Sequence, residues 1–441
     1  MKKYIKYIIA FWVFFFTIVI SMAITRHVYT NGEHIKGVSK EIVIFLSSFM
    51  SNVQHYDVID NPMFVADIPK LKNGFNYTKY FKGSKDYILV SAWDKEEAQN
   101  SVKLLRIKDG KVIHKWIVDI EKNNKKIIQN VKNNDFRVMN KKTSRMLHPF
   151  LQNDGTLVFG GEGVNMIDKN ANYVWSNTTI CHHSIERNEE GDFWICSYKS
   201  THENEGKYGL RDDAIQKISK NNGEILFEKS IFELLMENGY NRALFFTNPE
   251  ISTHIENLDY SHLNEVQPVE TDSKYWKKGD VFVSLRHPSL VFLYRPSTNK
   301  IIWSQQGPWM KQHDVVILND HQIAIFGNNV IDAKYKDVKK RLIDGNNIQY
   351  IYDFSTNKTT TAFTEFFKKS KIGTFTEGRS QILKDGNILV EESNHGRLLF
   401  GNEKNEIWTF VDRVDKNHLS SLNWCRYITE DEFKKFTFIK K

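Results

Sequence analysis

The segment SLVFLYRPSTNKIIW, residues 289–303, contains two short apolar runs joined by a polar turn. Short runs rich in β-branched and aromatic residues, bounded by turn residues, are typical of antiparallel strands. The same pattern returns along the chain in segments 102–116, 164–175, 214–227, 289–303, 348–363 and 396–410. A unit that recurs in this way indicates a repeat architecture.

Most of these segments follow a further pair of apolar runs around Asn-Asp-Gly, Glu-Gly or Asp-Gly turns, so each repeat contains four short strands. The sequence therefore predicts an all-β, six-bladed β-propeller over residues 80–425. We expect a strand from before Tyr87 or after Trp424 to complete one blade. A two-sheet sandwich is the alternative fold, but it does not explain the sixfold return of one pattern.

The N-terminus predicts export. Lys2, Lys3 and Lys6 precede an uncharged run from Tyr7 to Thr25, which is long enough to cross the roughly 30 Å hydrocarbon core of a bilayer. Residues 1–25 are therefore predicted to form a cytoplasmic tip and a single transmembrane helix in the inner (cytoplasmic) membrane, with the propeller on the periplasmic side. A cleaved signal peptide is the alternative, and it also exports the remainder.

The regions that flank the propeller are predicted to be simpler. Residues 26–79 form a helical stalk or linker and residues 426–441 a C-terminal tail. Cys181 and Cys196 are expected not to form a disulfide, because Cys181 should oppose Ser200. The net charge of +8 arises from 61 basic and 53 acidic residues spread along the chain, which does not indicate nucleic-acid binding.

Two histidines occupy equivalent positions in different repeats. His313 lies eight residues before His321 in its turn, and His183 lies eight before Gly191. Asn328 and Tyr198 lie seven residues after those turn positions. Residues equidistant from a tight turn face each other across a hairpin, so each histidine should neighbour one of these side chains.

The first strand of each blade lines the central channel of a propeller, so equivalent positions converge there. We expect His183, Arg286 and His313 to meet at one end of the channel, together with His262 and Asn264. A guanidinium fork is a natural partner for a tetrahedral oxyanion. For any single histidine, a satisfied core or surface position is the alternative.

Three further side chains are assigned from the same register. His148 is expected to be structural, because Leu147 occupies the equivalent position in its blade; a bulge that returns His148 to the channel is the alternative. Asp314 should point to the strand face opposite His313. Arg286 has an alternative as a buried ion-pair partner of Glu162 or Glu265.

The segments that carry these residues resemble one known family. They are CHHSIERNEEGDFWI (181–195), SHLNEV (261–266), VFVSLRHPSLVFLYRPSTNKIIWSQQGP (281–308) and QHDVVILNDHQIAIFGN (312–328). In order and spacing they are similar to the PAPS-independent arylsulfate sulfotransferases, which are periplasmic six-bladed propellers. The resemblance implies transfer of a sulfuryl group from an aryl sulfate ester to a phenolic or glycan hydroxyl, with no nucleotide, cofactor or metal.

The resemblance also implies roles for individual residues. His313 is the nucleophile and becomes transiently sulfated, Arg286, His262 and Asn264 bind the sulfuryl oxygens, and one histidine of the pair His182–His183 assists. The sequence departs from the family at 326–329, which reads Phe-Gly-Asn-Asn where FDNG is usual. A late lysine–threonine pair has no clear counterpart, and Gly378–Ser380 lies nearby.

Two other functions are compatible with the same residues. One is a non-catalytic envelope propeller that binds an anionic glycan or a protein. The other is a propeller hydrolase or lyase in which a histidine activates water. A homodimer is also compatible with the sequence.

Overall fold

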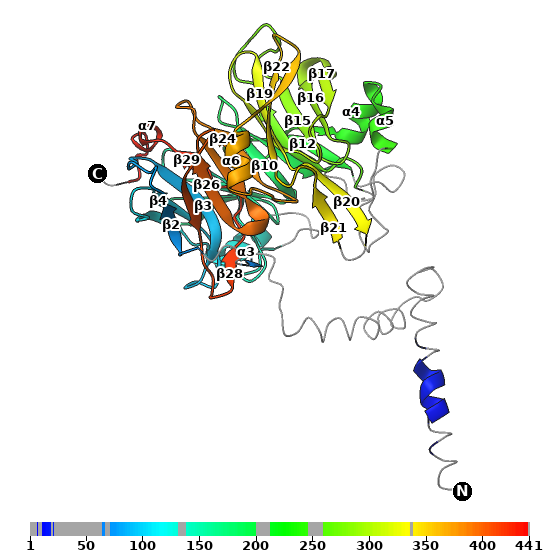
Figure 1. Cartoon of the computed structure of the whole chain (residues 1–441), viewed down its shortest axis with the longest axis vertical. Coiled ribbons are helices and arrows are strands. Elements are labelled where there is room, and N and C mark those ends of the chain that lie inside the picture. The colour runs from blue at the N-terminus through cyan, green and yellow to red at the C-terminus, as the bar shows by residue number, and fades with distance from the viewer. Residues whose placement is uncertain are drawn as a thin grey trace. The chain divides into compact units, whose positions relative to one another are not determined.

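The computed structural model describes residues 7, 11–18, 21, 64–66, 71–130, 138–199, 212–245, 259–335 and 338–439. The chain divides into two compact units, Met1–Asn61 and Pro62–Lys441. The second unit contains six antiparallel sheets of four or five strands, together with two short two-stranded ribbons (Figure 1). These six sheets are the blades of a propeller, which confirms the predicted fold.

The strands follow in chain order from the inner to the outer edge of most blades. Blade 2 comprises β6 (Leu147–Leu151), β7 (Leu157–Gly160), β8 (Val164–Ile167) and β9 (Tyr173–Asn177). Blade 3 comprises β10 (Cys181–Arg187), β11 (Phe193–Tyr198), β12 (Asp213–Ile218) and β13 (Ile225–Ser230). Blade 4 comprises β14 (Leu263–Pro268), β15 (Val281–Leu285), β16 (Leu290–Arg295) and β17 (Lys300–Gln306). Blade 5 comprises β18 (His313–Ile317), β19 (Gln322–Gly327), β22 (Ile348–Asp353) and β23 (Lys358–Ala362).

The two remaining blades use strands from the ends of the propeller. Blade 1 comprises β29 (Arg426–Ile428), β3 (Tyr87–Asp94), β4 (Gln99–Arg106) and β5 (Val112–Trp116). Blade 6 comprises β24 (Arg379–Ile382), β25 (Ile388–Glu392), β26 (Arg397–Gly401), β27 (Glu406–Val411) and β2 (Gly74–Tyr77). In Figure 1 the red β29 lies beside the blue β3, with which it pairs antiparallel. The repeated segments found in the sequence are the two strands that follow the first hairpin of each blade.

Short elements decorate the blades. The ribbons are β1 (Phe64–Ala66) with β28 (His418–Ser420), and β20 (Val330–Tyr335) with β21 (Val338–Leu342). The helices are α3 (Ile120–Asn130), α4 (Ile231–Glu237), α5 (Asn241–Phe245), α6 (Thr364–Lys369) and α7 (Glu430–Phe433), with single 3₁₀ turns η2 (Pro296–Thr298) and η3 (Ser393–His395).

The hydrophobic core lies between the blades. Six clusters of buried side chains each join two neighbouring blades, and together they run round the whole ring. The middle strands β15 and β16 are therefore buried on both faces, with the single exception of the half-buried Arg295, whereas the outer strand β17 is partly exposed. Strands covered on both sides read as continuous apolar runs, which is the pattern seen in VFVSL and LVFLY.

The ring is closed from both ends of the propeller. β29 forms the inner strand of blade 1, and β2 adds an outer fifth strand to blade 6, where Phe75 packs 5.1 Å from Trp408 between ring centroids. Arg426 also donates to Glu186 of blade 3 at 3.0 Å. The propeller therefore includes β2 and β29, which lie outside the predicted range 80–425. Their pairing covers the edges of β27 and β3, which would otherwise be exposed.

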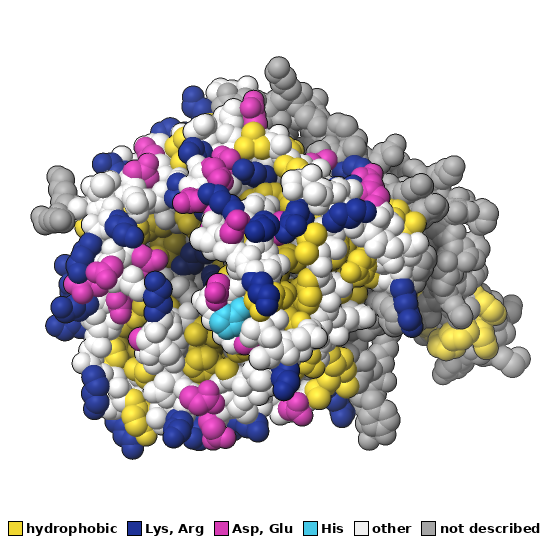
Figure 2. All heavy atoms as spheres, turned by 90° about the horizontal axis from the view of Figure 1, so that it is seen from above, with side chains coloured by type: hydrophobic (Ala, Val, Ile, Leu, Met, Phe, Trp, Pro, Cys, Tyr) yellow, Lys and Arg dark blue, Asp and Glu magenta, His cyan; other side chains and the backbone are white. Residues whose placement is uncertain are grey.

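Three expectations concern other parts of the chain. Only residues 7, 11–18 and 21 of the predicted transmembrane segment are described, and no helix among the described residues is both long and apolar enough to cross a bilayer. Most of the predicted helical stalk lies outside the described residues, and its described part contains the strands β1 and β2 instead of a helix. Cys181, Cys196 and Cys425 are free and buried, and Cys181 opposes Ser197 instead of the predicted Ser200. Figure 2 shows acidic and basic side chains interspersed over one face.

Closure makes a prediction about the two terminal strands. Truncation after Cys425 removes the inner strand of blade 1, so we expect loss of cooperative thermal unfolding in circular dichroism. A chain that begins at Thr78 loses β1 and the outer strand β2 of blade 6 but keeps the inner strand of every blade, so it should unfold cooperatively at a lower midpoint. An unchanged midpoint after truncation at Cys425 would show that β29 does not close the ring.

Candidate functional site

The inner strands of blades 2 to 5 share a local distortion. The pairing of each with its neighbour shifts register near its start, between Leu147 and Phe150, Cys181 and Ile185, Leu263 and Glu265, and His313 and Val315. Such bulges place an extra residue on one strand and redirect its side chains. His148 and Asp314 within two of these bulges, and His262 directly before a third, adopt left-handed φ angles of 49°, 54° and 49°. The repeated bulge brings histidines from four blades into one cavity.

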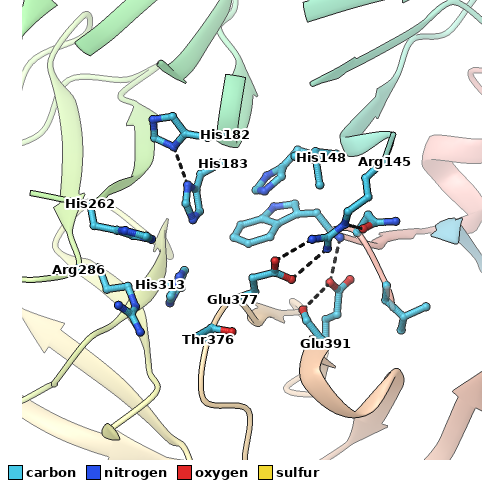
Figure 3. A pocket seen from close by; sticks show the side chains of 15 residues that line it. Arg145, His148, His182, His183, His262, Arg286, His313, Thr376, Glu377 and Glu391 are labelled. Atoms are coloured by element: carbon cyan, nitrogen blue, oxygen red, sulfur yellow. Dashed lines mark hydrogen bonds and ion pairs between the residues drawn. The ribbon is translucent and has the colours of Figure 1, made fainter. Parts of the chain in front are cut away.

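That cavity has a volume of about 240 Å³. It is lined by Arg145, Leu147, His148, His182, His183, His262, Arg286, His313, Thr376, Glu377, Glu391, Ser393, Leu422, Asn423 and Trp424. Figure 3 shows two facing groups, with His182, His183, His262, Arg286 and His313 on one side and Arg145, His148 and Glu377 on the other. Of the eight predicted site residues, the structure places His313, His183, Arg286, His262 and His182 in this lining.

His313 is buried and held in one tautomer. Its Nδ1 lies 2.7 Å from Oδ1 of Asn328. The side-chain amide of Asn328 is fixed in this orientation, because its Nδ2 donates to the carbonyls of Thr374 and Glu377 at 3.2 and 2.9 Å. Exchanging the positions of its oxygen and nitrogen would break both hydrogen bonds. Nδ1 of His313 must therefore carry the proton, and Nε2 carries the lone pair. This confirms that Asn328 neighbours His313, although the Cα partner of His313 is Phe326 because of the bulge.

A chain of two histidines sets the tautomer of His183. Nε2 of His182 lies 3.7 Å from Oδ1 of Asp213, and its Nδ1 lies 2.7 Å from Nδ1 of His183. The carboxylate favours a proton on Nε2 of His182, which makes Nδ1 of that ring the acceptor. His183 then donates from Nδ1 and keeps a lone pair on Nε2. Tyr198 stacks on His182 at 4.6 Å between ring centroids, outside the cavity lining.

His262 is oriented by a carboxylate. Its Nδ1 lies 2.6 Å from Oδ2 of Asp259, so this nitrogen is the donor. The ring centroid of His262 lies 5.1 Å from that of His183, which in turn lies 5.8 Å from that of His313. One ring nitrogen from each of the three histidines lies within 4.8 Å of the others.

The environment favours neutral imidazoles. Burial and the charge of Arg286 lower the pKa of His313 to about 3, despite the opposing bond to Asn328. Burial and the neighbouring histidines hold the pKa of His183 well below its ordinary value. Arg286 is 1% exposed and lines the same cavity, while its backbone N–H donates to the carbonyl of His262 at 3.0 Å. The site therefore combines uncharged nitrogen lone pairs with a fixed positive charge.

The opposite wall contains residues that the register did not identify. Arg145 binds Glu377 through two bonds, at 2.9 and 3.1 Å. Burial alone would raise the pKa of Glu377, but Arg145 outweighs it and holds this pKa below its usual value. His148 stacks on Trp424 at 3.8 Å between ring centroids. The expectation that His148 lies outside the site was wrong, because the bulge turns it into the cavity.

Asn264, which was expected to bind the sulfuryl group, lies outside the cavity, as does Arg379. Asn264 is fully buried, lies outside the cavity lining, and donates from Nδ2 to the carbonyl of Gln312 at 2.6 Å, at the junction of blades 4 and 5. Arg379 is also outside the lining. Its guanidinium lies 5.0 Å from the ring of Trp424 and 3.8 Å from Asp314, whose carboxylate accepts from the N–H of Ser380 at 2.8 Å.

The missed residues lie close to the positions that the register selected. Arg145 and His148 flank Leu147, and Glu377 precedes Gly378, the position equivalent to His313 in blade 6. A regular strand with strictly alternating side chains does not place these residues in the channel, because it contains no bulge. Trp424 and Asn423 belong to the segment that leads into β29, and the sequence alone did not assign that segment to the channel.

Comparison with solved structures finds matches of low sequence identity and low TM-score. The Dos1 propeller is 9% identical, with a TM-score of 0.38 over 77% of this chain and 74% of that chain. TolB from Acinetobacter baumannii is 7% identical, with a TM-score of 0.40 over 80% and 68%. The WD40 propeller domain of Doa1 is 11% identical, with a TM-score of 0.39 over 83% and 100%. No curated protein matches the chain in sequence.

The sequence comparison with protein families is more specific. Residues 148–413 match the arylsulfotransferase (ASST) family. The match extends from His148 of blade 2 into the residues after β27 of blade 6, so it includes His183, His262, Arg286 and His313. The chain therefore belongs to the arylsulfotransferase family, which makes it a transferase by descent.

Proposed function

We propose that this protein moves a sulfuryl group from an aryl sulfate ester to a hydroxyl acceptor through a sulfohistidine at His313, without a nucleotide donor. The observation that carries the proposal is the geometry of His313. Its Nδ1 is occupied by Asn328, so its remaining nitrogen is the nucleophilic one, and it shares a buried cavity with Arg286. A neutral imidazole with one oriented lone pair is suited to nucleophilic catalysis.

In the first half-reaction, Nε2 of His313 attacks sulfur, the bond between sulfur and the aryl oxygen breaks, and a phenolate leaves. Negative charge is carried by the sulfuryl oxygens and by the departing oxygen. Arg286 is positioned beside His313 before the reaction, and its planar fork can bind two of those oxygens. A preorganised donor of this kind lowers the barrier because it needs no reorganisation during the reaction.

In the second half-reaction, an acceptor hydroxyl attacks the sulfur of the sulfohistidine and the bond between nitrogen and sulfur breaks. His183 is suited to take the hydroxyl proton, because its Nε2 has a lone pair and its Nδ1 proton is shared with His182. His262, fixed by Asp259, is the other candidate for this proton transfer. Nε2 of His313 recovers its lone pair, and the histidine that took the acceptor proton gives it to the phenolate released in the next turnover, so the cycle can repeat.

The opposite wall is suited to the aromatic part of the substrates. Trp424 and His148 form a stacked pair at the cavity surface, and aromatic rings pack favourably on such surfaces. The volume of about 240 Å³ lies below the roughly 300–1,000 Å³ typical of small-molecule pockets. We therefore expect aryl donors with a single ring to fit better than large ones.

The deciding experiment is an assay with a chromogenic aryl sulfate in the presence and absence of a phenol acceptor. Phenol release that depends on the acceptor, with formation of the new sulfate ester, supports transfer. Equal release without acceptor indicates a hydrolase. No release with any aryl sulfate indicates a binding protein instead.

Replacing His313 tests the nucleophile. His313→Ala should reduce transfer to background, since no other side chain is placed to form the sulfated intermediate in this scheme. His321→Ala is a matched control from the same hairpin, partly exposed at its tip, and should keep wild-type kcat. Circular dichroism checks that both variants fold, and substantial turnover by a folded His313→Ala protein would remove His313 from the mechanism.

Arg286 and Asn264 should respond differently to substitution. Arg286→Lys keeps the charge but loses the fork, so we expect kcat to fall by about 10²–10³, as for loss of one oxyanion donor. Asn264→Ala should instead lower the free energy of unfolding by about 1–3 kcal/mol, because the Gln312 carbonyl loses its donor. Steady-state kinetics and chemical denaturation measure the two effects. A large loss of kcat in stable Asn264→Ala protein would place that amide in the catalytic site.

We also propose that residues 1–25 anchor the protein in the cytoplasmic membrane with the propeller outside the cytoplasm. Within the uncharged run, the described residues 11–18 are helical and their side chains, including Phe11, Trp12 and Phe14, are exposed. The full-length protein should fractionate with membranes, and its propeller should be digested by protease added from outside. A propeller protected from that protease would contradict the orientation, and a mature chain that starts near residue 24 would indicate a cleaved signal peptide.

A further inference from the structure

We infer that His183, His262 and His313 also bind a divalent transition-metal ion of the Zn²⁺ class, and that this ion blocks sulfuryl transfer. Among the described residues, these three histidines are one of two groups whose nitrogen or oxygen atoms are close enough to share an ion. The other group, Asp259, His262 and His287, shares one histidine with it. The metal site does not depend on the proposed function, whereas the inhibition of sulfuryl transfer rests on it.

The three ligands come from rigid positions. They lie on or beside the inner strands β10, β14 and β18, which are packed between neighbouring blades. Their nitrogens lie within 4.8 Å of one another, whereas a tetrahedral ion with Zn–N bonds of about 2.0–2.1 Å requires a separation of roughly 3.4 Å. Binding an ion therefore requires rotation of the three imidazoles about their side-chain bonds.

The hydrogen bonds around the histidines favour ligation. In metal sites, a ligating imidazole almost always donates its other N–H to a carboxylate, a carbonyl or a similar acceptor. Here Asp259 accepts from His262, the Asn328 amide oxygen accepts from His313, and His182 occupies Nδ1 of His183. The three Nδ1 atoms are therefore the donors, and Nε2 of each ring is the nitrogen that can act as a ligand. This arrangement is the one that a three-histidine site requires.

The surrounding charges balance the ion in part. Asp259 and Asp213 stand behind His262 and His182, on the far side of the rings from the cavity, and supply negative charge. Arg286 supplies a positive charge that opposes a cation. Three protein nitrogens leave a fourth position open, as in catalytic zinc sites, and a water or anion there would face the guanidinium. Imidazole ligands select Zn²⁺ and its neighbours over Mg²⁺ or Ca²⁺, which prefer oxygen.

The two uses of the site exclude each other. Each imidazole has a single lone pair on Nε2, and a bond to the ion occupies it. A coordinated His313 cannot attack sulfur, and a sulfated His313 cannot bind the ion. Zn²⁺ should therefore act as an inhibitor that competes with the aryl sulfate, and a chelator should restore activity.

The test is titration of the purified full-length chain, stripped with chelator, with Zn²⁺ by calorimetry and with Co²⁺ by visible absorption. We expect one ion per chain and the intense absorption of tetrahedral Co²⁺. His262→Ala should abolish both signals. Asp259→Asn keeps all three ligands but loses the carboxylate partner, and should bind about 10–100-fold more weakly. Asp320→Asn is the matched control. It alters a similar histidine–carboxylate pair on the surface, in which Nδ1 of His321 lies 2.6 Å from Asp320, and this variant should bind the ion with wild-type affinity.

The outcomes separate this inference from the proposed function. Absence of a stoichiometric Zn²⁺ or Co²⁺ signal, or a signal equal in wild type and a folded His262→Ala protein, overturns the metal site, whatever the transferase activity. Binding with the expected variant pattern supports it, even if no aryl sulfate is turned over. If the protein is active and saturating Zn²⁺ leaves its rate unchanged, the inferred block of sulfuryl transfer is wrong.

Discussion

Burial of every blade against two neighbours is the constraint on which the rest of the structure depends. No blade can cover its own apolar faces, so the six interblade clusters form only when the ring is complete. Closure takes one strand from each end of the propeller, β29 for the inner edge of blade 1 and β2 for the outer edge of blade 6. Residues separated by more than a hundred positions thereby reach one cavity, as His183 and His313 do.

The cavity depends on a second, local feature, which is the bulge at the start of four inner strands. A regular strand would direct alternate residues towards and away from the channel. The bulges redirect His148 and the His182–His183 pair towards the cavity, and His262 lies directly before a third bulge. Hydrogen-bond partners then hold the rings. Because Asn328, Asp259 and His182 occupy the Nδ1 atoms, the Nε2 atoms are the reactive ones. The same orientation supports both proposals, nucleophilic attack on sulfur and binding of a transition-metal ion.

Much of the architecture could be predicted from the sequence, because the repeated runs of apolar residues and turns report directly on four-stranded blades. The convergence of His183, Arg286, His262 and His313 followed from one rule, that equivalent positions in a propeller meet at the channel. The other wall could not be predicted in the same way. Alternation along a strand carries no information about bulges, so His148, Arg145 and Glu377 were missed. Asn264 illustrates the opposite error, since its position near His262 in sequence does not bring its amide into the cavity.

The account rests on a covalent intermediate at one nitrogen of His313. The most direct measurement is mass spectrometry of the full-length protein after brief exposure to an aryl sulfate without acceptor, followed by peptide mapping under conditions that preserve the nitrogen–sulfur bond. We predict one added SO₃ group per chain, located on the peptide that contains His313 and removed when a phenol is supplied. A protein that transfers sulfate to phenol while carrying no such group on His313, or carrying it on another residue, would contradict the account.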